Sequence, residues 1–258
     1  MSEDFYRIKR LPPYVFAEVN RLKADYRSKG VDIIDFGMGN PDMDTPHHIV
    51  EKLVQTVRKS RTHRYSSSKG INGLRKAQAR YYKNRFDVAL DPEREIIATL
   101  GSKEGLANLA MAITAPGDVM LVPNPSYPIH PYGFMIAGGT LRHLPTLHDG
   151  KFKPEEYMQS LSRAVAHSVP KPVALVVSFP SNPTAQLCDI DFYKELISFA
   201  KKNNLWILSD LAYAEIYFDG NPPPSILQVN GAKEVAVEFT SLSKTFSMPG
   251  WRMGFAVG

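Results

Sequence analysis

The sequence predicts an α/β fold in which a mostly parallel sheet carries helices on both faces. Short apolar runs typical of β-strands alternate with helical stretches along most of the chain. The run 172–179 is almost continuously apolar, as expected of a strand covered on both faces. Polar residues follow several of these strands, at the sheet edge where ligands bind in folds of this kind.

The composition is that of an ordinary globular protein. The chain has 258 residues, of which 43% are hydrophobic and 22% charged, and these values exclude wholesale disorder and fibrous repeats. A chain of this length buries roughly 70–75% of its unfolded surface and needs no disulfide bonds. Cys188 is the only cysteine, which fits a reducing compartment, and we expect a small buried thiol. The net charge of +5 suits anionic ligands.

No targeting or membrane segment is expected. Residues 1–10 lack the apolar core of a signal peptide, and no apolar run approaches the ~20 residues that a membrane span needs. These features predict a cytoplasmic protein.

The N-terminal part differs from the rest of the chain. We expect residues 1–45 to form an irregular arm and a segment of a small domain, with a short helix near 14–29. Residues 46–258 then form the main domain. Its first helix is expected to begin with Thr45 as the N-cap and Pro46 in the first turn. One apolar stripe of that helix consists of Ile49, Val50, Leu53, Val54 and Val57.

The remaining elements alternate in the order expected of β-α-β units. We expect a buried helix over 104–114, which is apolar nearly all round, and an amphipathic helix over 191–202. The strands of the sheet are expected at 95–100, 119–122, 172–179, 205–209 and 235–239.

Four loops that follow strands carry the polar groups of interest. They offer a Gly/Ser-rich turn, an amide, a carboxylate with a phenol, and a lysine, and an arginine follows the last loop. The loops are 101–105, 180–184, 210–213 and 240–247, and the arginine is Arg252. This set of groups fits a phosphorylated aromatic aldehyde bound as an imine, which is pyridoxal 5′-phosphate (PLP).

A phosphate dianion needs several N–H donors and a positive potential. A Gly/Ser-rich turn at a helix N-terminus supplies both, here through the backbone of Ser102 and Lys103. Ser241 and Ser243 add hydroxyl donors, and Arg252 adds a bidentate guanidinium. The turn taken alone is more often an ordinary strand-to-helix connection.

Lys244 is the candidate for imine formation. Its amine must be unprotonated to attack a carbonyl carbon, so we expect a desolvated site close to other cations. A single lysine is more often a solvated surface residue. The small hydroxyl residues beside it and the Gly-Trp-Arg segment that ends at Arg252 favour the functional interpretation.

Asp210 ends an apolar strand, where an unpaired carboxylate would be costly. Paired with the pyridine nitrogen of PLP, it would keep that nitrogen protonated and make the ring an electron sink. A helix N-cap or a loop carboxylate is the alternative. Asn182 and Tyr213 can donate hydrogen bonds to the phenolate oxygen of the ring. Tyr127 can stack on the ring face, or it is a core or surface tyrosine.

These motifs resemble those of the class I/II aminotransferases, which are PLP enzymes of fold type I. The segment 241–254 matches the attachment site of the cofactor, and 210–213 matches the Asp-x-x-Tyr motif. Residues 182–184 match the Asn-Pro-Thr-Gly motif, with Ala185 in place of the glycine. The resemblance runs over nearly the whole chain and is closest to the bacterial glutamate–pyruvate (alanine) aminotransferases. Methionine, aspartate and diaminopimelate aminotransferases share much of the same framework and stay open as alternatives.

The resemblance implies a function and its residues. It implies ping-pong transamination between an alanine-like L-amino acid and 2-oxoglutarate or pyruvate. Lys244, Asp210 and Tyr213 would be the catalytic residues in that reaction. Gly39 and Asn182 would bind the substrate, with the backbone of Gly39 against its carboxylate.

The resemblance also implies a shared site and an incomplete chain. Tyr65 would reach the cofactor phosphate of a neighbouring subunit, so the enzyme would be a homodimer. Members of the family are longer, and residues 253–257 resemble a strand inside their main domain. We therefore expect a C-terminally truncated chain that lacks most of the small domain and is weak or inactive alone.

Two other functions remain open. One is a PLP-dependent lyase or decarboxylase of the same fold, in which the same loops serve the cleavage of a different bond. The other is a non-catalytic PLP-binding regulatory domain of the kind fused to a DNA-binding helix-turn-helix. The basic run 58–64 is better explained as a solvated helix end, so no nucleic acid or membrane is expected as a partner. The seven histidines show no ligand spacing, so we expect no metal and place them at the surface or at helix starts.

Overall fold

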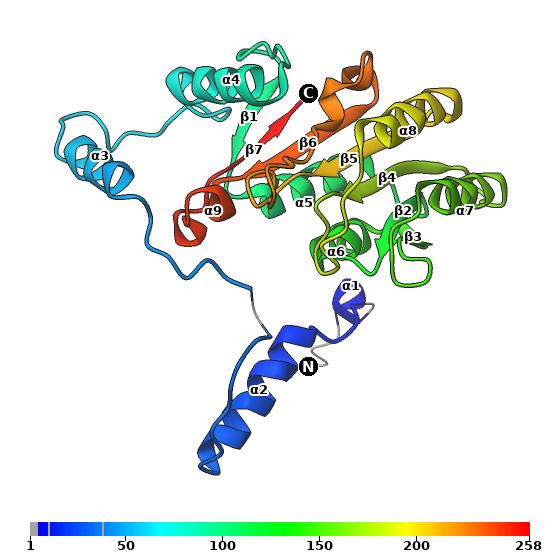
Figure 1. The fold of residues 1–258 in the computed structure, drawn as a ribbon, viewed down its shortest axis with the longest axis horizontal. Helices are drawn as coiled ribbons and strands as arrows, with labels where there is room; N and C mark the ends of the chain where they lie inside the picture. Colours follow the sequence, from blue (N-terminus) through cyan, green and yellow to red (C-terminus); the bar gives the residue numbers. More distant parts are fainter. Residues whose placement is uncertain (1–4, 10, 38) are drawn as a thin grey trace.

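A seven-stranded sheet lies between two layers of helices in the computed structural model, which describes residues 5–9, 11–37 and 39–258 (Figure 1). The strands lie in the order β1-β7-β6-β5-β4-β2-β3. They are β1 Ile96–Thr99, β2 Val119–Asn124, β3 Thr140–Pro145, β4 Pro172–Ser178, β5 Trp206–Asp210, β6 Ala236–Ser241 and β7 Gly254–Val257. Neighbours from β3 to β6 are parallel, and β7 is antiparallel to both β6 and β1. The predicted mostly parallel sheet is confirmed.

The two helical layers come from different parts of the chain. One face is covered by α4 Asn72–Phe86, α7 Pro154–Ala166 and α8 Ile190–Asn203. The other face is covered by α5 Ser102–Ile113 and α6 Ile129–Ala137. The other helical elements are α1 Tyr6–Lys9, α2 Val15–Ser28, α3 His47–Val57, α9 Leu242–Thr245 and the 3-10 turns η1 Ile226–Gln228, η2 Ala232–Glu234 and η3 Pro249–Trp251.

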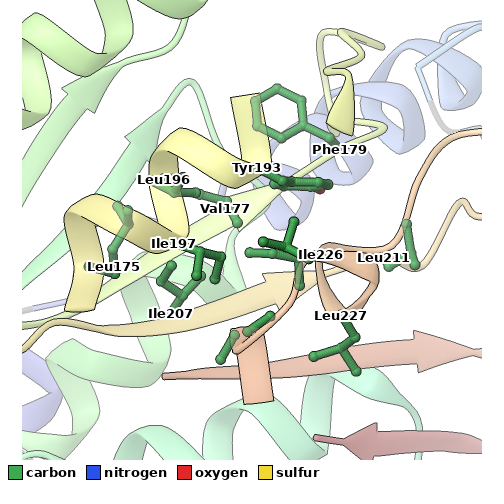
Figure 2. Close-up of a cluster of buried hydrophobic side chains, with 14 of the residues drawn as sticks. Leu175, Val177, Phe179, Tyr193, Leu196, Ile197, Ile207, Leu211, Ile226 and Leu227 are labelled. Atoms are coloured by element: carbon green, nitrogen blue, oxygen red, sulfur yellow. The ribbon is translucent and has the colours of Figure 1, made fainter. Parts of the chain in front are cut away.

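Alternate side chains of the central strands enter two separate cores. In β4, Leu175 and Val177 belong to the core under α7 and α8, whereas Ala174 and Val176 belong to the core under α5 and α6. A strand buried on both faces requires this period of two. Figure 2 shows the first core, in which Tyr193 of α8 packs over the strands. Each fully buried large apolar side chain stabilises the fold by roughly 1.5–3 kcal/mol.

Strands β1 to β6 all end at one edge of the sheet. β4 ends at Ser178 and β5 at Asp210, and the parallel register pairs these two residues. The reversed strand β7 begins at the same edge, because its Gly254 pairs with Ser241 at the end of β6 and with Thr99 at the end of β1. The loops that carry the predicted site residues therefore begin side by side.

Two expectations about the helices are wrong. The N-cap of α3 is Pro46, and the hydroxyl of Thr45 donates to the carbonyl oxygen of Ser247 at 2.8 Å instead of capping the helix. α5 is not buried all round, and Met111 is half exposed. Only the side of α5 that faces the sheet and α6 is covered.

The N-terminal helices make little contact with the sheet. Figure 1 shows α2 standing away from it, and neither α2 nor α3 contains a buried residue. Residues 31–37 and 39–46 contain no helix or strand. In the part of the chain that the structure describes, every helix is too short or too polar to span a bilayer.

Candidate active site

A cleft of about 580 Å³ opens at the edge where the strands end. Its walls are the strand-end loops and residues of the N-terminal part, among them Tyr14 and Phe16. All but one of the predicted site residues line it, namely Gly39, Ser102, Lys103, Tyr127, Asn182, Asp210, Tyr213, Ser241, Ser243, Lys244 and Arg252. The exception is Tyr65, which is fully exposed and lies outside the cleft.

Asp210 is paired with a buried histidine. Its Oδ2 lies 2.9 Å from Nε2 of His130, which the α6 helix presents from the neighbouring layer. Its Oδ1 accepts the backbone N–H of Ala212 at 3.3 Å. Both side chains are buried, and Asp210 also lines the cleft. The pairing offsets the cost of placing this carboxylate at a buried strand end.

Sequence reasoning missed His130. The residue lies in the first turn of α6, one of the places expected for a histidine, but it has no exposed surface. Its Nδ1 has no hydrogen-bond partner among the described residues. The available signal was its position three residues after Tyr127, whose ring it meets edge to face at 6.0 Å.

Asn182, Tyr213 and Lys244 come together from three loops. Nδ2 of Asn182 donates to the hydroxyl oxygen of Tyr213 at 3.2 Å. Nζ of Lys244 lies 5.9 Å from the centroid of the Tyr213 ring. Burial raises the pKa of Tyr213, so its phenol stays protonated and can donate a hydrogen bond.

Lys244 loses its proton more easily than an ordinary lysine. It lies on the short helix α9 and is half-buried. Burial first, and then the positive charge of Arg252, lower the pKa of its amine. A larger share of nucleophilic free amine at neutral pH follows from this shift.

Arg252 and the turn before α5 form an anion cradle. Nη2 of Arg252 donates to the carbonyl oxygen of Leu100 at 3.2 Å, and Nη1 donates to that of Pro249 at 2.6 Å. Gly101 has a φ of +89°, and a Cβ on it would collide with the guanidinium. Ser102 opens α5 and lines the cleft, where the first N–H groups of the helix have no partner within it.

The remaining residues complete the walls of the cleft. The hydroxyl of Ser241 accepts the backbone N–H of Ser243 at 3.2 Å and so caps α9. Nζ of Lys103 lies 5.9 Å from the centroid of the Tyr127 ring. In the described ranges, no group of three or more His, Cys, Asp or Glu residues is placed to hold a metal ion.

The residues present fit PLP. Its phosphate would enter a cradle that one added Cβ on Gly101 would fill, next to a guanidinium and a helix N-terminus. Its aldehyde would meet the amine of Lys244, and its ring nitrogen could pair with Asp210.

Comparison with known proteins gives one consistent family. The family described as "Aminotransferase class I and II" matches residues 31–258. The chain is 64% identical to the aminotransferase AatC of Rhizobium meliloti (strain 1021), covering 99% of this chain and 62% of that protein. It is 51% identical to the glutamate-pyruvate aminotransferase AlaC of Escherichia coli (strain K12), covering 98% and 60%. It is 47% identical to the LL-diaminopimelate aminotransferase of Aquifex aeolicus (strain VF5), covering 100% and 65%.

A solved structure agrees with these relatives. The substrate-bound structure of BacF from Bacillus subtilis matches with a TM-score of 0.88 and 34% identity, over 100% of this chain and 64% of that one. The chain thus spans 60 to 65% of the length of the curated relatives that it matches. With a family match over most of its length, the chain belongs to the class I and II aminotransferases, a family that uses PLP.

Proposed function

We propose that this chain binds PLP in the cleft and that the protein transfers an amino group between an alanine-like L-amino acid and a 2-oxo acid. One observation carries the proposal. The amine of Lys244, with its lowered pKa, the carboxylate of Asp210 and the anion cradle at Gly101 and Arg252 belong to a single cleft. When bound, PLP supplies an electron sink that stabilises negative charge at the substrate α-carbon.

Lys244 serves twice in this proposal. Its free amine would hold the cofactor by a covalent bond to the aldehyde carbon, with the aldehyde oxygen lost as water. Once the amino group of the substrate had taken its place, the freed amine would accept a proton from the substrate α-carbon and return it to the former aldehyde carbon of the cofactor. The lowered pKa of Lys244 increases the share of the amine in the proton-accepting form.

Polar side chains hold the ring in place around that amine. Asp210, whose carboxylate is oriented by His130, would keep the ring nitrogen protonated. The hydrogen-bonded pair Asn182 and Tyr213 would donate to the phenolate oxygen. Tyr127 would pack on the ring face.

The phosphate is held by the cradle and its neighbours. Arg252, the N–H groups of Ser102 and Lys103, and the hydroxyls of Ser241 and Ser243 all line the cleft and would hold it. The substrate carboxylate would lie against Gly39 and Asn182, which line the same cleft.

Covalent capture of the cofactor tests the site. The chain is incubated with PLP, reduced with borohydride and mapped by peptide mass spectrometry. We expect the label on Lys244 and its loss in Lys244→Ala, with Lys194→Ala, a lysine outside the cleft that pairs with Asp191, as the control that keeps it. Asp210→Ala should still be labelled, because the carboxylate is not needed for anchoring. A label on another lysine contradicts the assignment.

Substrate turnover tests the reaction. Relatives are named for glutamate–pyruvate and for LL-diaminopimelate transamination, and we propose the first type. In a version of the protein that has the full length of its relatives, alanine with 2-oxoglutarate should be the better pair when compared with LL-diaminopimelate at equal concentration. The 258-residue chain alone should turn over either substrate weakly or not at all. Faster turnover of diaminopimelate, or release of a cleaved or decarboxylated product from either amino acid, contradicts the proposal.

We further propose a homodimer with shared sites, and a cytoplasmic location. The full exposure of Tyr65 supports the first, because a residue that contributes to a partner's site must be accessible in a single copy. The free thiol of Cys188 supports the second, since cytoplasmic thiols stay reduced.

A further inference from the structure

The loop that carries Tyr213 is fastened to α4 outside the cleft. Oε1 of Glu215, two residues after Tyr213, accepts a hydrogen bond from the hydroxyl of Tyr81 at 2.5 Å and another from Nε of Arg85 at 3.1 Å. Tyr81 and Arg85 are four residues apart in α4, so they project from the same side of the helix. None of these three residues lines the cleft.

Arg85 also joins the two ends of that loop. Its Nη2 donates to the carbonyl oxygens of Ala214 at 3.3 Å and Pro223 at 3.4 Å. Its guanidinium lies 4.6 Å from the ring centroid of Phe86 and 5.6 Å from that of Tyr217. A planar group with five donors is suited to hold one carboxylate and two carbonyls at once.

The cluster is largely shielded from solvent. The side chains of Arg85 and Glu215 are 18% and 23% exposed. Burial first, and then Glu215, raise the pKa of Tyr81, so its hydroxyl remains a donor. Hydrogen bonds to an ionised partner are about twice as strong as neutral ones. Loss of the carboxylate would leave two donors without their acceptor.

We propose that Glu215, Arg85 and Tyr81 form a clamp that positions the phenol of Tyr213 against the bound cofactor, an inference that rests on the proposed function. The clamp holds the carbonyl of Ala214, the residue directly after Tyr213. When the phenol is fixed, it donates a hydrogen bond to the phenolate oxygen of the cofactor, and the nitrogen that joins Lys244 to the cofactor is then harder to protonate. If the loop is loosened, that hydrogen bond weakens, and the same nitrogen stays protonated up to a higher pH.

The test is a pH titration of the visible absorbance of the PLP-loaded chain. Glu215→Ala removes the acceptor of both Tyr81 and Arg85, and we expect the midpoint to rise by about half to one pH unit. Tyr213→Phe should raise it at least as far. In a Tyr213→Phe background, Glu215→Ala should add little, because the clamp acts through that hydroxyl.

The same helix offers a matched control. Arg75 of α4 pairs with Glu93 at 3.0 Å and also binds the carbonyl oxygens of Gly70 and Pro92. Glu93→Ala therefore breaks an arginine–glutamate pair of the same design that does not contact the loop of Tyr213. Its titration midpoint should equal that of the wild type. Tyr81→Phe, which removes a single hydroxyl, replaces Glu215→Ala if that variant does not fold, with a smaller shift expected in the same direction.

The outcomes separate this inference from the proposed function. If borohydride does not label Lys244 in the wild type, the proposed function fails, and the clamp proposal falls with it. If Lys244 is labelled and the wild type titrates but Glu215→Ala keeps the wild-type midpoint, only the clamp is overturned. The clamp is also overturned if Glu215→Ala shifts the titration midpoint equally in the wild type and in Tyr213→Phe, because the effect would then not pass through the Tyr213 hydroxyl.

Discussion

At the residue scale, Arg252 acts on two neighbours at once. Its charge lowers the pKa of Lys244, although burial is the larger cause of that shift. Its guanidinium also closes the cradle over Gly101. The residue therefore links the anchoring of a phosphate to the reactivity of the amine.

Removing the charge of Arg252 should make Lys244 more basic. In Arg252→Gln, we expect the pKa of Lys244 to rise but to stay below its ordinary value, because burial, the larger cause of the shift, remains. The pH dependence of acetylation of Lys244 in the PLP-free chain, followed by peptide mass spectrometry, measures this shift. Arg142→Gln is the control, since Arg142 bonds to His167 and Ser168 instead. An unchanged acetylation midpoint in Arg252→Gln would contradict the coupling.

A methyl group on Gly101 should damage the cradle. In Gly101→Ala the added Cβ meets the Arg252 guanidinium, so we expect PLP to bind about tenfold more weakly, equivalent to roughly 1.4 kcal/mol. Gly150→Ala is the matched control, because Gly150 also has a positive φ, +77°, but nothing lies within 4 Å of an added Cβ. Both variants should lose some stability from backbone strain. Fluorescence titration with PLP would refute the cradle if both variants bound it equally well.

At the element scale, α4 is docked to β6 through polar contacts inside the core. The hydroxyl of Tyr82 donates to Glu238 at 2.9 Å, and Nε2 of Gln78 donates to the hydroxyl of Thr240 at 3.1 Å. Gln78 and Tyr82 are four residues apart and lie on the same face of the helix. Their partners, Thr240 and Glu238, are two residues apart and lie on the same face of the strand. Glu238 also accepts bonds from Ser209 at 3.1 Å and from Ser225 at 2.5 Å. The network joins the helix to β5 and β6, whose ends line the cleft.

Glu238 should make the stability of the fold depend on pH. Burial raises its pKa above 4.5, so the folded chain binds this proton more tightly than the unfolded chain. The stability that protonated Glu238 gives the fold is therefore fully present below the pKa of the unfolded state. It is lost as pH rises through the pKa of the folded state. As pH rises from about 4.5, the free energy of unfolding of the wild type should therefore fall relative to that of Glu238→Gln.

Urea unfolding at several pH values measures that difference. Hydroxyl partners can turn to accept from the glutamine amide, so Glu238→Gln is expected to fold. Glu234→Gln, at an exposed glutamate paired with Lys201, is the control and should show no such trend. A difference that is constant with pH would show that Glu238 does not titrate between these states.

At the scale of the whole molecule, the proposed shared site predicts complementation between two inactive copies. Tyr65→Ala lacks the contribution to the partner's phosphate site, and Lys244→Ala cannot anchor the cofactor. In a mixed dimer, one site combines Lys244 from one copy with Tyr65 from the other, so about a quarter of all sites in an equal mixture should be intact and should bind the phosphate tightly. At limiting PLP we expect borohydride labelling of about that fraction of the wild-type level. Sedimentation analysis gives the oligomeric state. A monomer, or a mixture that binds no better than its components, would contradict the shared site.

Local patterns in the sequence determined the fold class and most of the candidate site. Apolar periodicity located five of the strands within a few residues, and the loops after them contain nine of the eleven predicted site residues that line the cleft. The predictions succeeded there because the ends of parallel strands meet at one edge whatever the details of packing. α4, α6, α7 and β3 were missed, and in α4 the buried stripe contains Arg75 and Gln78, which no apolar pattern reveals.

Only the tertiary structure decided which polar groups became partners. His130 meets Asp210 across 80 positions, Gln78 meets Thr240 across 162, and Glu215 meets Tyr81 across 134. A buried polar group must find a hydrogen-bond partner, but the sequence does not say which distant element will supply it. That choice follows from how the helices pack on the two faces of the sheet, and so the pairing of the carboxylate and the bracing of the Tyr213 loop became visible only in three dimensions.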